Sequence, residues 1–168
     1  KPLVYALALE KDYTPTSLVL DAPFVIDQGE GLKTWKPENY GKKFYGPSTL
    51  RIGIEKSRNL MTVRVAQKVG FKEISKITNN FGVYKDAPEL LSVSLGAAET
   101  TLIKLTNAYC TFVNGGKKVK PIFIDRIQNR RGKTIFNADK RKCLGCEEIS
   151  YLKDDIPLIK DERKQIIS

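Results

Sequence analysis

The 168-residue sequence contains no histidine. This absence excludes, within the chain, a Ser-His-Asp triad, a Cys-His nucleophile pair and every histidine-ligated metal site. A nucleophilic enzyme would therefore take its base from Lys, Tyr or a carboxylate. Long apolar runs are also missing. The longest, Pro2 to Leu9, falls far short of the roughly 20 residues that span a bilayer, and no signal peptide is recognisable.

Acidic residues are scarce relative to basic ones. The chain holds 29 Lys and Arg against 19 Asp and Glu, which gives a net charge of +10. Residues 117–142 alone hold ten basic and two acidic residues, a net charge of +8. This charge is typical of surfaces that attract nucleic acid, anionic lipid or another anionic polymer. A solvated edge strand that Lys and Arg protect from pairing accounts for it equally well.

The hydrophobic content of 41% is enough for one domain with a core, or for part of a larger one. Apolar residues recur at helical spacing in several segments. We expect a helix that ends near residues 11–12 and helices that cover residues 59–69 (capped by Asn59), 71–81 and 101–113. A helix start at Pro47-Ser48 and a short apolar segment predict a further helix over 50–56. In the last helix we expect five side chains to face inward: Leu102, Leu105, Ala108, Tyr109 and Phe112.

The intervening and following segments are not helical. Residues 13–45 are rich in Pro, Gly and Asp, which indicates an irregular region with one or two short strands. Residues 122–128 and 133–137 flank Asn129-Arg130-Arg131-Gly132, a good hairpin turn. Phe123 and Phe136 on these segments are expected in the core, which argues against base stacking. Helices followed by a hairpin predict an α+β fold, a helical subdomain against an antiparallel sheet.

The patterns at both ends of the sequence lead us to expect further residues before and after it. Pro2 suits only the first turn of a helix, so we expect that helix to begin within about three residues upstream of Lys1. Residues 154–168 are polar and show no sign of closing a fold, and we interpret them as a connector.

Two places on the chain could carry chemistry. Lys1 sits in a first helical turn beside apolar residues, where desolvation and the helix terminus favour the neutral amine, although any terminal lysine looks similar. Ser57-Arg58-Asn59 lies in a tight connection between two helices, where a hydroxyl and an amide can share a cleft. The same triplet is also explained as a plain helix cap.

Several stretches, in order, resemble segments of the transpeptidase domain of class A penicillin-binding proteins. They resemble the helix after the active-site serine, the loop before the second motif, the S-x-N motif itself and the core helix that follows. The stretches are Lys1-Pro2-Leu3-Val4-Tyr5-Ala6-Leu7-Ala8-Leu9-Glu10, Asp21-Ala22-Pro23, Trp35-Lys36-Pro37-Glu38-Asn39-Tyr40, residues 46–51 and 55–60, residues 94–101 and residues 108–116. Each is short, but the ordered set covers most of residues 1–137.

The resemblance implies a D,D-transpeptidase that cross-links peptidoglycan stem peptides through a serine acyl-enzyme and binds β-lactams, without cofactor or metal. In its S-x-x-K motif, a serine attacks the penultimate D-Ala carbonyl and a lysine one helical turn later takes the proton. Lys1 matches that lysine. Ser57 matches the serine that relays protons towards the leaving group, and Asn59 the amide that orients substrate and lysine.

The sequence also departs from the family pattern. The nucleophilic serine, expected three positions before Lys1, and the K-[ST]-G motif are not among the 168 residues, so these residues alone are expected to be inactive. We assign 1–137 to a partial transpeptidase domain and 138–168 to a C-x-x-C insert and connector. The resemblance implies a preceding membrane anchor and glycosyltransferase domain, and a location on the periplasmic face of the bacterial inner membrane. The alternative is a basic, non-enzymatic module that binds nucleic acid or another anionic polymer through residues 117–142.

Three remaining motifs are ambiguous. Residues 150–153 fit S-x-x-K formally but lie in a poorly patterned segment, and Gly132-Lys133-Thr134 lacks the glycines of a phosphate loop or of the third motif, so we interpret it as a hairpin turn. Cys143 and Cys146 form a C-x-x-C whose alternatives are a disulfide, favoured by the periplasm that the resemblance implies, free thiols or half a metal site. Cys110 is expected to be a small buried residue.

Overall fold

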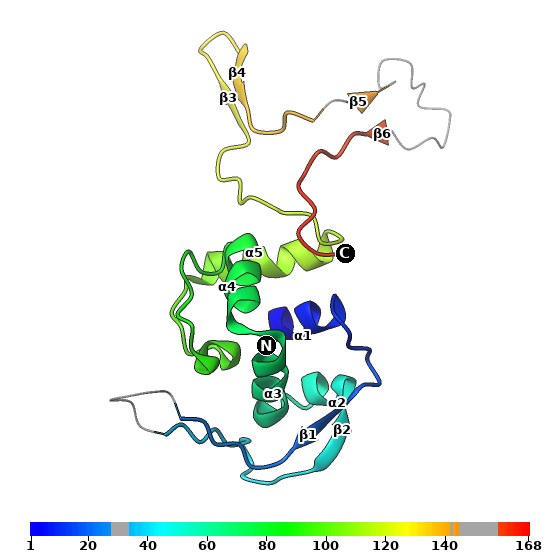
Figure 1. The fold of residues 1–168 in the computed structure, drawn as a ribbon. Helices are drawn as coiled ribbons and strands as arrows, with labels where there is room; N and C mark the ends of the chain where they lie inside the picture. The colour runs from blue at the N-terminus through cyan, green and yellow to red at the C-terminus, as the bar shows by residue number, and fades with distance from the viewer. Residues whose placement is uncertain (28–33, 142, 145–157) are drawn as a thin grey trace.

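The computed structural model describes residues 1–27, 34–141, 143–144 and 158–168. These residues form a helical body and a long arm (Figure 1). The body contains α1 (Pro2–Leu9), β1 (Leu18–Asp21), β2 (Gly46–Thr49), α2 (Leu50–Glu55), α3 (Asn59–Val69), α4 (Phe71–Asn80), the 3-10 helix η1 (Leu91–Leu95) and α5 (Leu102–Val113). The arm contains β3 (Arg126–Gln128), β4 (Thr134–Asn137), β5 (Cys143–Leu144) and β6 (Leu158–Ile159). Helices with small antiparallel sheets confirm the α+β class.

The helix α3 is the centre of the body. It contacts α1, α2, α4, η1 and β1, and its apolar side chains are buried almost all round. The buried members are Leu60, Met61, Val63, Val65, Ala66 and Val69. A helix that is hydrophobic on most sides is stable only when other elements surround it, so α3 organises the packing of the body. Gly70, with φ of 96°, ends α3 as the sequence predicts.

The strand β2 corrects one prediction. Pro47-Ser48 does not start a helix but lies in β2, which pairs antiparallel with β1 from Leu18 opposite Thr49 to Asp21 opposite Gly46. The helix α2 begins only at Leu50, and Thr49 caps it by accepting a hydrogen bond from the Ile52 N–H. The partner strand lies far earlier in the chain and decides the conformation here, and no local pattern announces it.

The inward face of α5 also differs from the prediction. Ala108 is buried and Phe112 packs against the core, 4.8 Å from the ring of Phe81. However, Leu102, Leu105 and Tyr109 are exposed. Thr111 is fully buried instead, so the face of α5 that contacts the core is rotated about the helix axis relative to the predicted face. Cys110 is exposed as well, contrary to its predicted burial.

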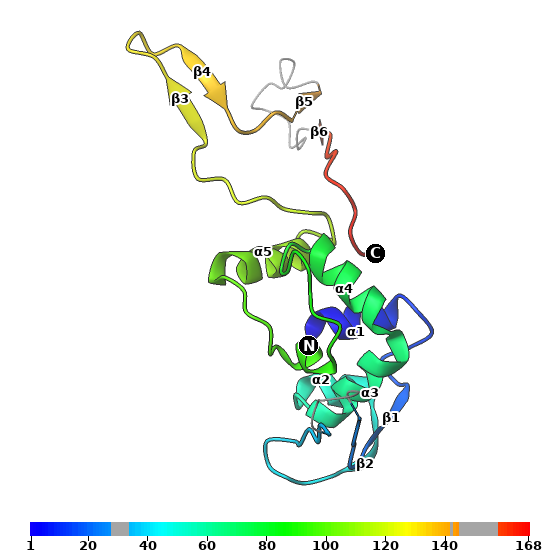
Figure 2. The ribbon, with the colours of Figure 1, turned by 60° about the vertical axis from the view of Figure 1, so that its left-hand side comes forward.

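The basic hairpin lies apart from the helices. The strands β3 and β4 pair antiparallel with a bulge after Ile127, and the Asn129 side chain accepts from the backbone N–H of Arg131 and Lys133. This confirms the predicted hairpin and its turn at Asn129–Gly132, although residues 122–125 lie outside β3 and Thr134 already begins β4. Both ribbon views show it far from the helical body (Figures 1 and 2). Phe123 and Phe136 are exposed there rather than in the core, because the described residues of the hairpin lie outside that core.

The C-terminal segment returns to the body. The backbone N–H of Lys118 donates to the Lys164 carbonyl, and that of Ile166 donates to the Gly116 carbonyl. Ile167 is buried in the main core. This segment therefore closes the arm at its base, although the polar sequence gives no sign of it.

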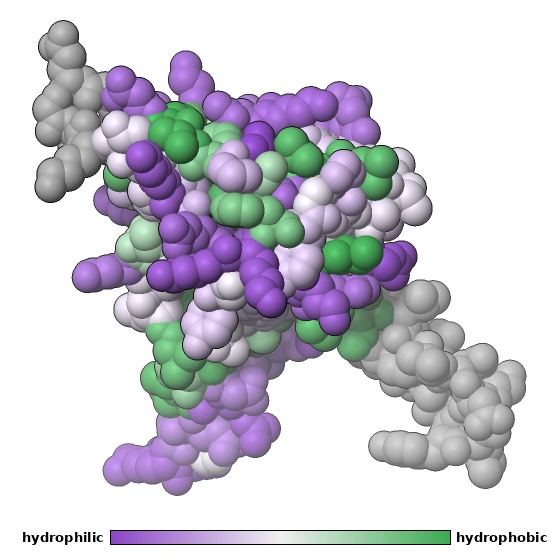
Figure 3. Space-filling view, turned by 90° about the horizontal axis from the view of Figure 1, so that it is seen from below, coloured by the Kyte–Doolittle hydropathy of each residue, from purple (hydrophilic) through white to green (hydrophobic). Residues whose placement is uncertain are grey.

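Seen from below, the molecule presents hydrophobic patches separated by hydrophilic side chains (Figure 3).

Candidate active site

The three candidate side chains of the sequence, Lys1, Ser57 and Asn59, meet in one place, the Lys1 cluster. The Lys1 ammonium donates to the Ser57 carbonyl at 2.7 Å, to Ser57 Oγ at 2.8 Å and to Asn59 Oδ1 at 2.5 Å. A lysine ammonium has three protons to donate, and each finds an acceptor here. Residues so far apart in the sequence are joined because α1 and α3 pack against each other.

Ser57 adopts an unusual backbone conformation. Its φ is 52°, in the left-handed region that non-glycine residues rarely visit. The turn is stabilised by backbone hydrogen bonds from Ser57 to the Ile54 carbonyl and from Arg58 to the Gly53 carbonyl. In this conformation both the hydroxyl and the carbonyl of Ser57 contact Lys1. Such strain is found preferentially at functional sites.

The Asn59 side chain is held at both ends of its amide. Its oxygen accepts from Lys1, and its Nδ2 donates to the Glu38 carbonyl at 2.7 Å. Asn59 is the first residue of α3, and its side chain does not serve as the cap that the sequence predicts. The capping oxygen comes from Asn39 Oδ1, which accepts from the Asn59 N–H at 2.9 Å. The distant Asn39 thereby frees the Asn59 side chain to contact Lys1.

The surroundings of Lys1 favour its neutral form more than water does. Partial burial, which penalises the charged ammonium, lowers the pKa of Lys1 from its usual value. Behind the cluster, the Tyr5 hydroxyl lies 3.3 Å from Thr62 Oγ1, and burial raises the pKa of Tyr5. A lysine with a lowered pKa is better suited to accept a proton near neutral pH.

The buried carboxylate of Asp21 is linked to the Lys1 cluster through Asn39. Asp21 is fully buried, with Oδ1 accepting from Asn39 Nδ2 at 2.7 Å and Oδ2 lying 3.9 Å from Arg58 Nε. The Arg58 guanidinium stacks 3.3 Å above the ring of Tyr45. Asp21 and Asn39 belong to the stretches that carry the family resemblance, yet sequence reasoning did not place them at the site. No local spacing links residues 21, 39 and 59.

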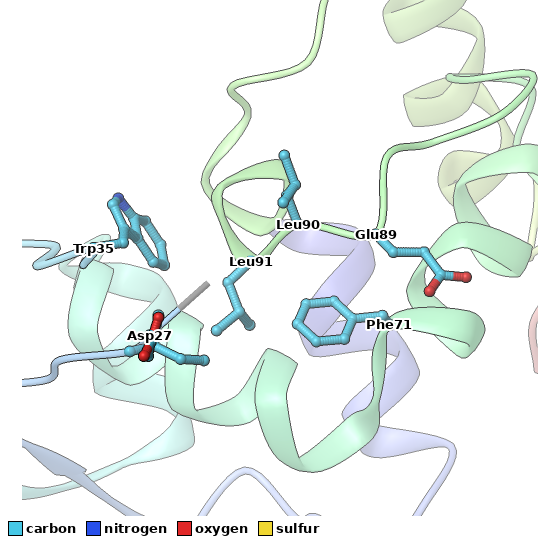
Figure 4. Close-up of a pocket in the computed structure, with 7 residues that line it drawn as sticks. Asp27, Trp35, Phe71, Glu89, Leu90 and Leu91 are labelled. Carbon is cyan, nitrogen blue, oxygen red and sulfur yellow. The ribbon is translucent and has the colours of Figure 1, made fainter. Parts of the chain in front are cut away.

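A separate cavity of about 170 Å³ is lined by Ile26, Asp27, Trp35, Phe71, Glu89, Leu90 and Leu91. The Phe71 ring points towards Leu91 across it (Figure 4). Lys1, Ser57 and Asn59 are not among the described residues that line it, so it is distinct from the Lys1 cluster.

Comparison with known proteins decides the family. The sequence model of the family described as penicillin binding protein transpeptidase domain matches residues 1–150. The chain belongs to the penicillin-binding protein transpeptidase family. Penicillin-binding protein 1A of Rickettsia conorii is 47% identical over 146 residues, which cover 87% of this chain and 18% of that protein. Penicillin-binding protein 1A of Haemophilus influenzae is 37% identical over 172 residues, covering 100% of this chain and 19% of that protein.

Solved structures of penicillin-binding proteins agree with this family assignment. The crystal structure of penicillin-binding protein 1A from Haemophilus influenzae matches 83% of this chain and 21% of its own, with a TM-score of 0.76 and 36% identity. PonA1 from Mycobacterium tuberculosis, at 19% identity, shares the fold with a TM-score of 0.68, covering 81% of this chain and 39% of its own. The transpeptidase fold is thus confirmed. The chain spans about a fifth of the length of the curated relatives it matches.

These matches do not support the alternative of a basic, non-enzymatic module that binds an anionic polymer. Among the described residues, no helix is both long enough and apolar enough to cross a bilayer. Within the same residues, no three His, Cys, Asp or Glu side chains come together in a way that could hold an ion. Cys146 and residues 150–153 lie outside the described part of the chain, so the pairing of Cys143 stays a prediction.

Proposed function

We propose that the protein carrying this chain is a peptidoglycan D,D-transpeptidase that cross-links stem peptides through a serine acyl-enzyme and is acylated by β-lactams. The observation that carries the proposal is the contact of the Lys1 amine with Ser57 and Asn59 in a chain of the penicillin-binding protein transpeptidase family. Penicillin-binding protein A of Mycobacterium tuberculosis, which shares the fold, forms an acyl-enzyme with imipenem.

In the proposed acylation, Lys1 is the base. The neutral Lys1 amine takes the proton of a serine hydroxyl three positions before it, as that oxygen bonds to the penultimate D-Ala carbonyl carbon. The carbon to nitrogen bond to the last D-Ala then breaks, and the leaving amine needs a proton. Ser57 Oγ, 2.8 Å from Lys1 Nζ, is placed to pass that proton from Lys1 to the amine. Asn59 orients the lysine and the substrate amide.

The second half of the reaction reverses these roles. The amine of another stem peptide bonds to the ester carbonyl carbon and loses its proton through Ser57 to Lys1. The ester bond breaks, and the serine oxygen recovers a proton from Lys1. No step needs a metal or an organic cofactor, because lysine, hydroxyl and amide supply the proton transfers and the orientation.

The remaining parts of the proposal concern the whole protein. We propose a membrane anchor and a peptidoglycan glycosyltransferase domain on the N-terminal side, with the transpeptidase on the periplasmic face of the inner membrane. Residues 1–137 would form part of the transpeptidase domain, and residues 138–168 an insert and connector. Penicillin-binding proteins 1A of about five times this length support the presence of further domains.

The test is intact-mass spectrometry of the full-length protein with and without excess benzylpenicillin, followed by peptide mapping. We expect one adduct of the antibiotic's mass on a serine three positions before Lys1. A folded protein that contains that serine and gains no mass would refute the proposed function.

A further inference from the structure

Asn39 connects the Lys1 cluster to the interior of the body. Its side-chain oxygen accepts from two backbone N–H groups at the start of α3, Asn59 at 2.9 Å and Leu60 at 3.4 Å. Its Nδ2 donates to Asp21 Oδ1 at 2.7 Å and to the Lys43 carbonyl at 3.0 Å. An amide has two donor protons and two acceptor sites, and all four are used here.

The burial of this network makes it rigid. Asn39 is 5% exposed and Asp21 is fully buried. A buried amide that loses one of these partners keeps an unsatisfied polar group away from water, which is unfavourable. The side chain of Asn39 therefore has one stable orientation, and the first turn of α3 is fixed relative to β1.

The same segment also orients the Asn59 side chain. Glu38, next to Asn39, presents the carbonyl that accepts from Asn59 Nδ2. With Nδ2 engaged there, Oδ1 is directed at the Lys1 ammonium. A rotated Asn59 amide would present N–H groups to that ammonium, so the position of residues 38–39 decides whether Lys1 has its third acceptor.

We propose that Asn39 is a positioning residue for acylation, which holds the backbone and the amide of Asn59 so that Asn59 keeps Lys1 in place. This inference rests on the proposed transpeptidase function. The hydrogen bonds of Asn39 in the described structure go to Asp21, Lys43, Asn59 and Leu60, and Lys1 is not among these partners. It acts through Asn59, and Asp21 acts through Asn39.

The first test uses Asn39→Ala in the full-length protein. We expect the acylation rate constant at saturating benzylpenicillin to fall by about 10- to 100-fold, the scale of small misplacements of catalytic groups. The half-saturating concentration should change little, because Asn39 is buried and offers little surface to the antibiotic. Thr78→Val is the matched control. It removes a buried hydroxyl that donates to the Ser75 carbonyl on α4, and it should lower the melting temperature without slowing acylation.

The second test exchanges the partners. Asn39→Asp alone sets a second carboxylate against Asp21 and should slow acylation. Adding Asp21→Asn restores the hydrogen bond between the two side chains, with the amide at position 21 as the donor, and the new carboxylate at position 39 still accepts from the start of α3. The bond to the Lys43 carbonyl and the ion pair with Arg58 are not restored. We expect the double variant to acylate faster than Asn39→Asp without reaching the wild-type rate, which a general loss of stability does not predict.

The outcomes separate the two proposals. A wild-type protein that benzylpenicillin does not label refutes the transpeptidase function before any variant is compared. If the wild type is labelled and folded Asn39→Ala acylates at the same saturating rate, the positioning role is refuted. If Asn39→Ala does not fold, the exchanged pair decides. A double variant no faster than Asn39→Asp overturns the inference, and recovery supports it.

Discussion

At the scale of single residues, the Lys1 cluster is dominated by neutral acceptors. The ammonium faces a carbonyl, a hydroxyl and an amide oxygen. These dipoles hold the lysine in one place but do not offset its desolvation as a carboxylate would, which is why burial lowers its pKa. The hydrogen-bond geometry of Lys1 and its lowered pKa thus favour the same role, that of a lysine that alternately accepts and releases a proton.

Replacing Lys1 tests that role. Lys1→Ala should slow acylation of the full-length protein by benzylpenicillin by about 10²- to 10⁴-fold, the usual contribution of a general base. In the proposed mechanism the neutral amine is the active form, so the rate in the wild type should rise with pH. Because the pKa of Lys1 is lowered, the midpoint of that rise should lie below 10.5. Stopped-flow acylation between about pH 5 and pH 10 checks both expectations. A rate independent of pH and of Lys1 would exclude it as the base.

Two substitutions at Ser57 separate backbone strain from chemistry. Ser57→Ala and Ser57→Gly both remove the hydroxyl that contacts Lys1, so both should slow acylation equally. Only Gly relaxes the backbone at φ of 52°. Urea denaturation should therefore find Ser57→Gly more stable than Ser57→Ala by about 1 kcal/mol. Equal stabilities would mean that the left-handed conformation carries no strain.

The residues that contact Lys1 could be predicted from the sequence, whereas those behind them could not. Ser57 and Asn59 form the S-x-N stretch of the family resemblance, which implies their place beside Lys1, whereas the local pattern is explained equally well as a helix cap. Asp21 and Asn39 lie in an irregular region 38 and 20 residues before Asn59. Their role depends on a capping bond from a distant side chain and on a buried carboxylate, which only the folded chain creates.

At the scale of elements, α2 positions Ser57 by its close approach to α1 and α3. A Cβ at Gly53 would lie 2.8 Å from the Tyr5 hydroxyl and 2.9 Å from Met61 Cε. Met61 is fully buried, and Tyr5 is 3% exposed and contacts Thr62, so moving either side-chain end would disturb other contacts of the core. The sequence predicts a short apolar helix here, although with the wrong start, but it cannot predict this contact, because the pattern does not report the distance to the neighbouring helix.

Gly53→Ala tests this packing. Helix propensity alone would favour Ala, but we expect a loss of about 1–3 kcal/mol from overpacking and slower acylation, since Ser57 follows the displaced turn. Gly41→Ala is the control, because a Cβ there meets no atom of the described residues within 4 Å. Denaturation and acylation of both variants provide the measurement. A Gly53→Ala protein as stable as the wild type would contradict the close contact.

At the scale of the whole molecule, the C-terminal segment joins the two ends of the described chain. Ser168 donates its backbone N–H and its hydroxyl to Glu10 Oε1 at the end of α1, at 2.7 and 2.8 Å. The Gln165 side chain donates to the Gly115 carbonyl. Composition predicts a polar connector here, because the two residues that pack on the core, buried Ile167 and half-buried Ile166, form no periodic pattern.

A pair of adjacent glycines tests this closure. Gly115 and Gly116 both have positive φ, of 63° and 78°, so Ala is strained at either position. Only at Gly116 would the added Cβ also meet the Ile167 carbonyl oxygen. Gly116→Ala should therefore destabilise the protein more than Gly115→Ala and increase hydrogen exchange in residues 164–168. Equal effects of the two substitutions would show that the segment does not dock there.

The bonds between residues 116–118 and 164–166 also have a consequence for chain length. They close the residues between them into a loop, and the described residues of this loop join the body at its base. For such a loop, doubling the number of residues adds only about 0.6 kcal/mol of closure entropy. The arm can therefore gain or lose residues at little thermodynamic cost while α1 and α3 keep their positions, and the helical body can remain constant as the arm diverges.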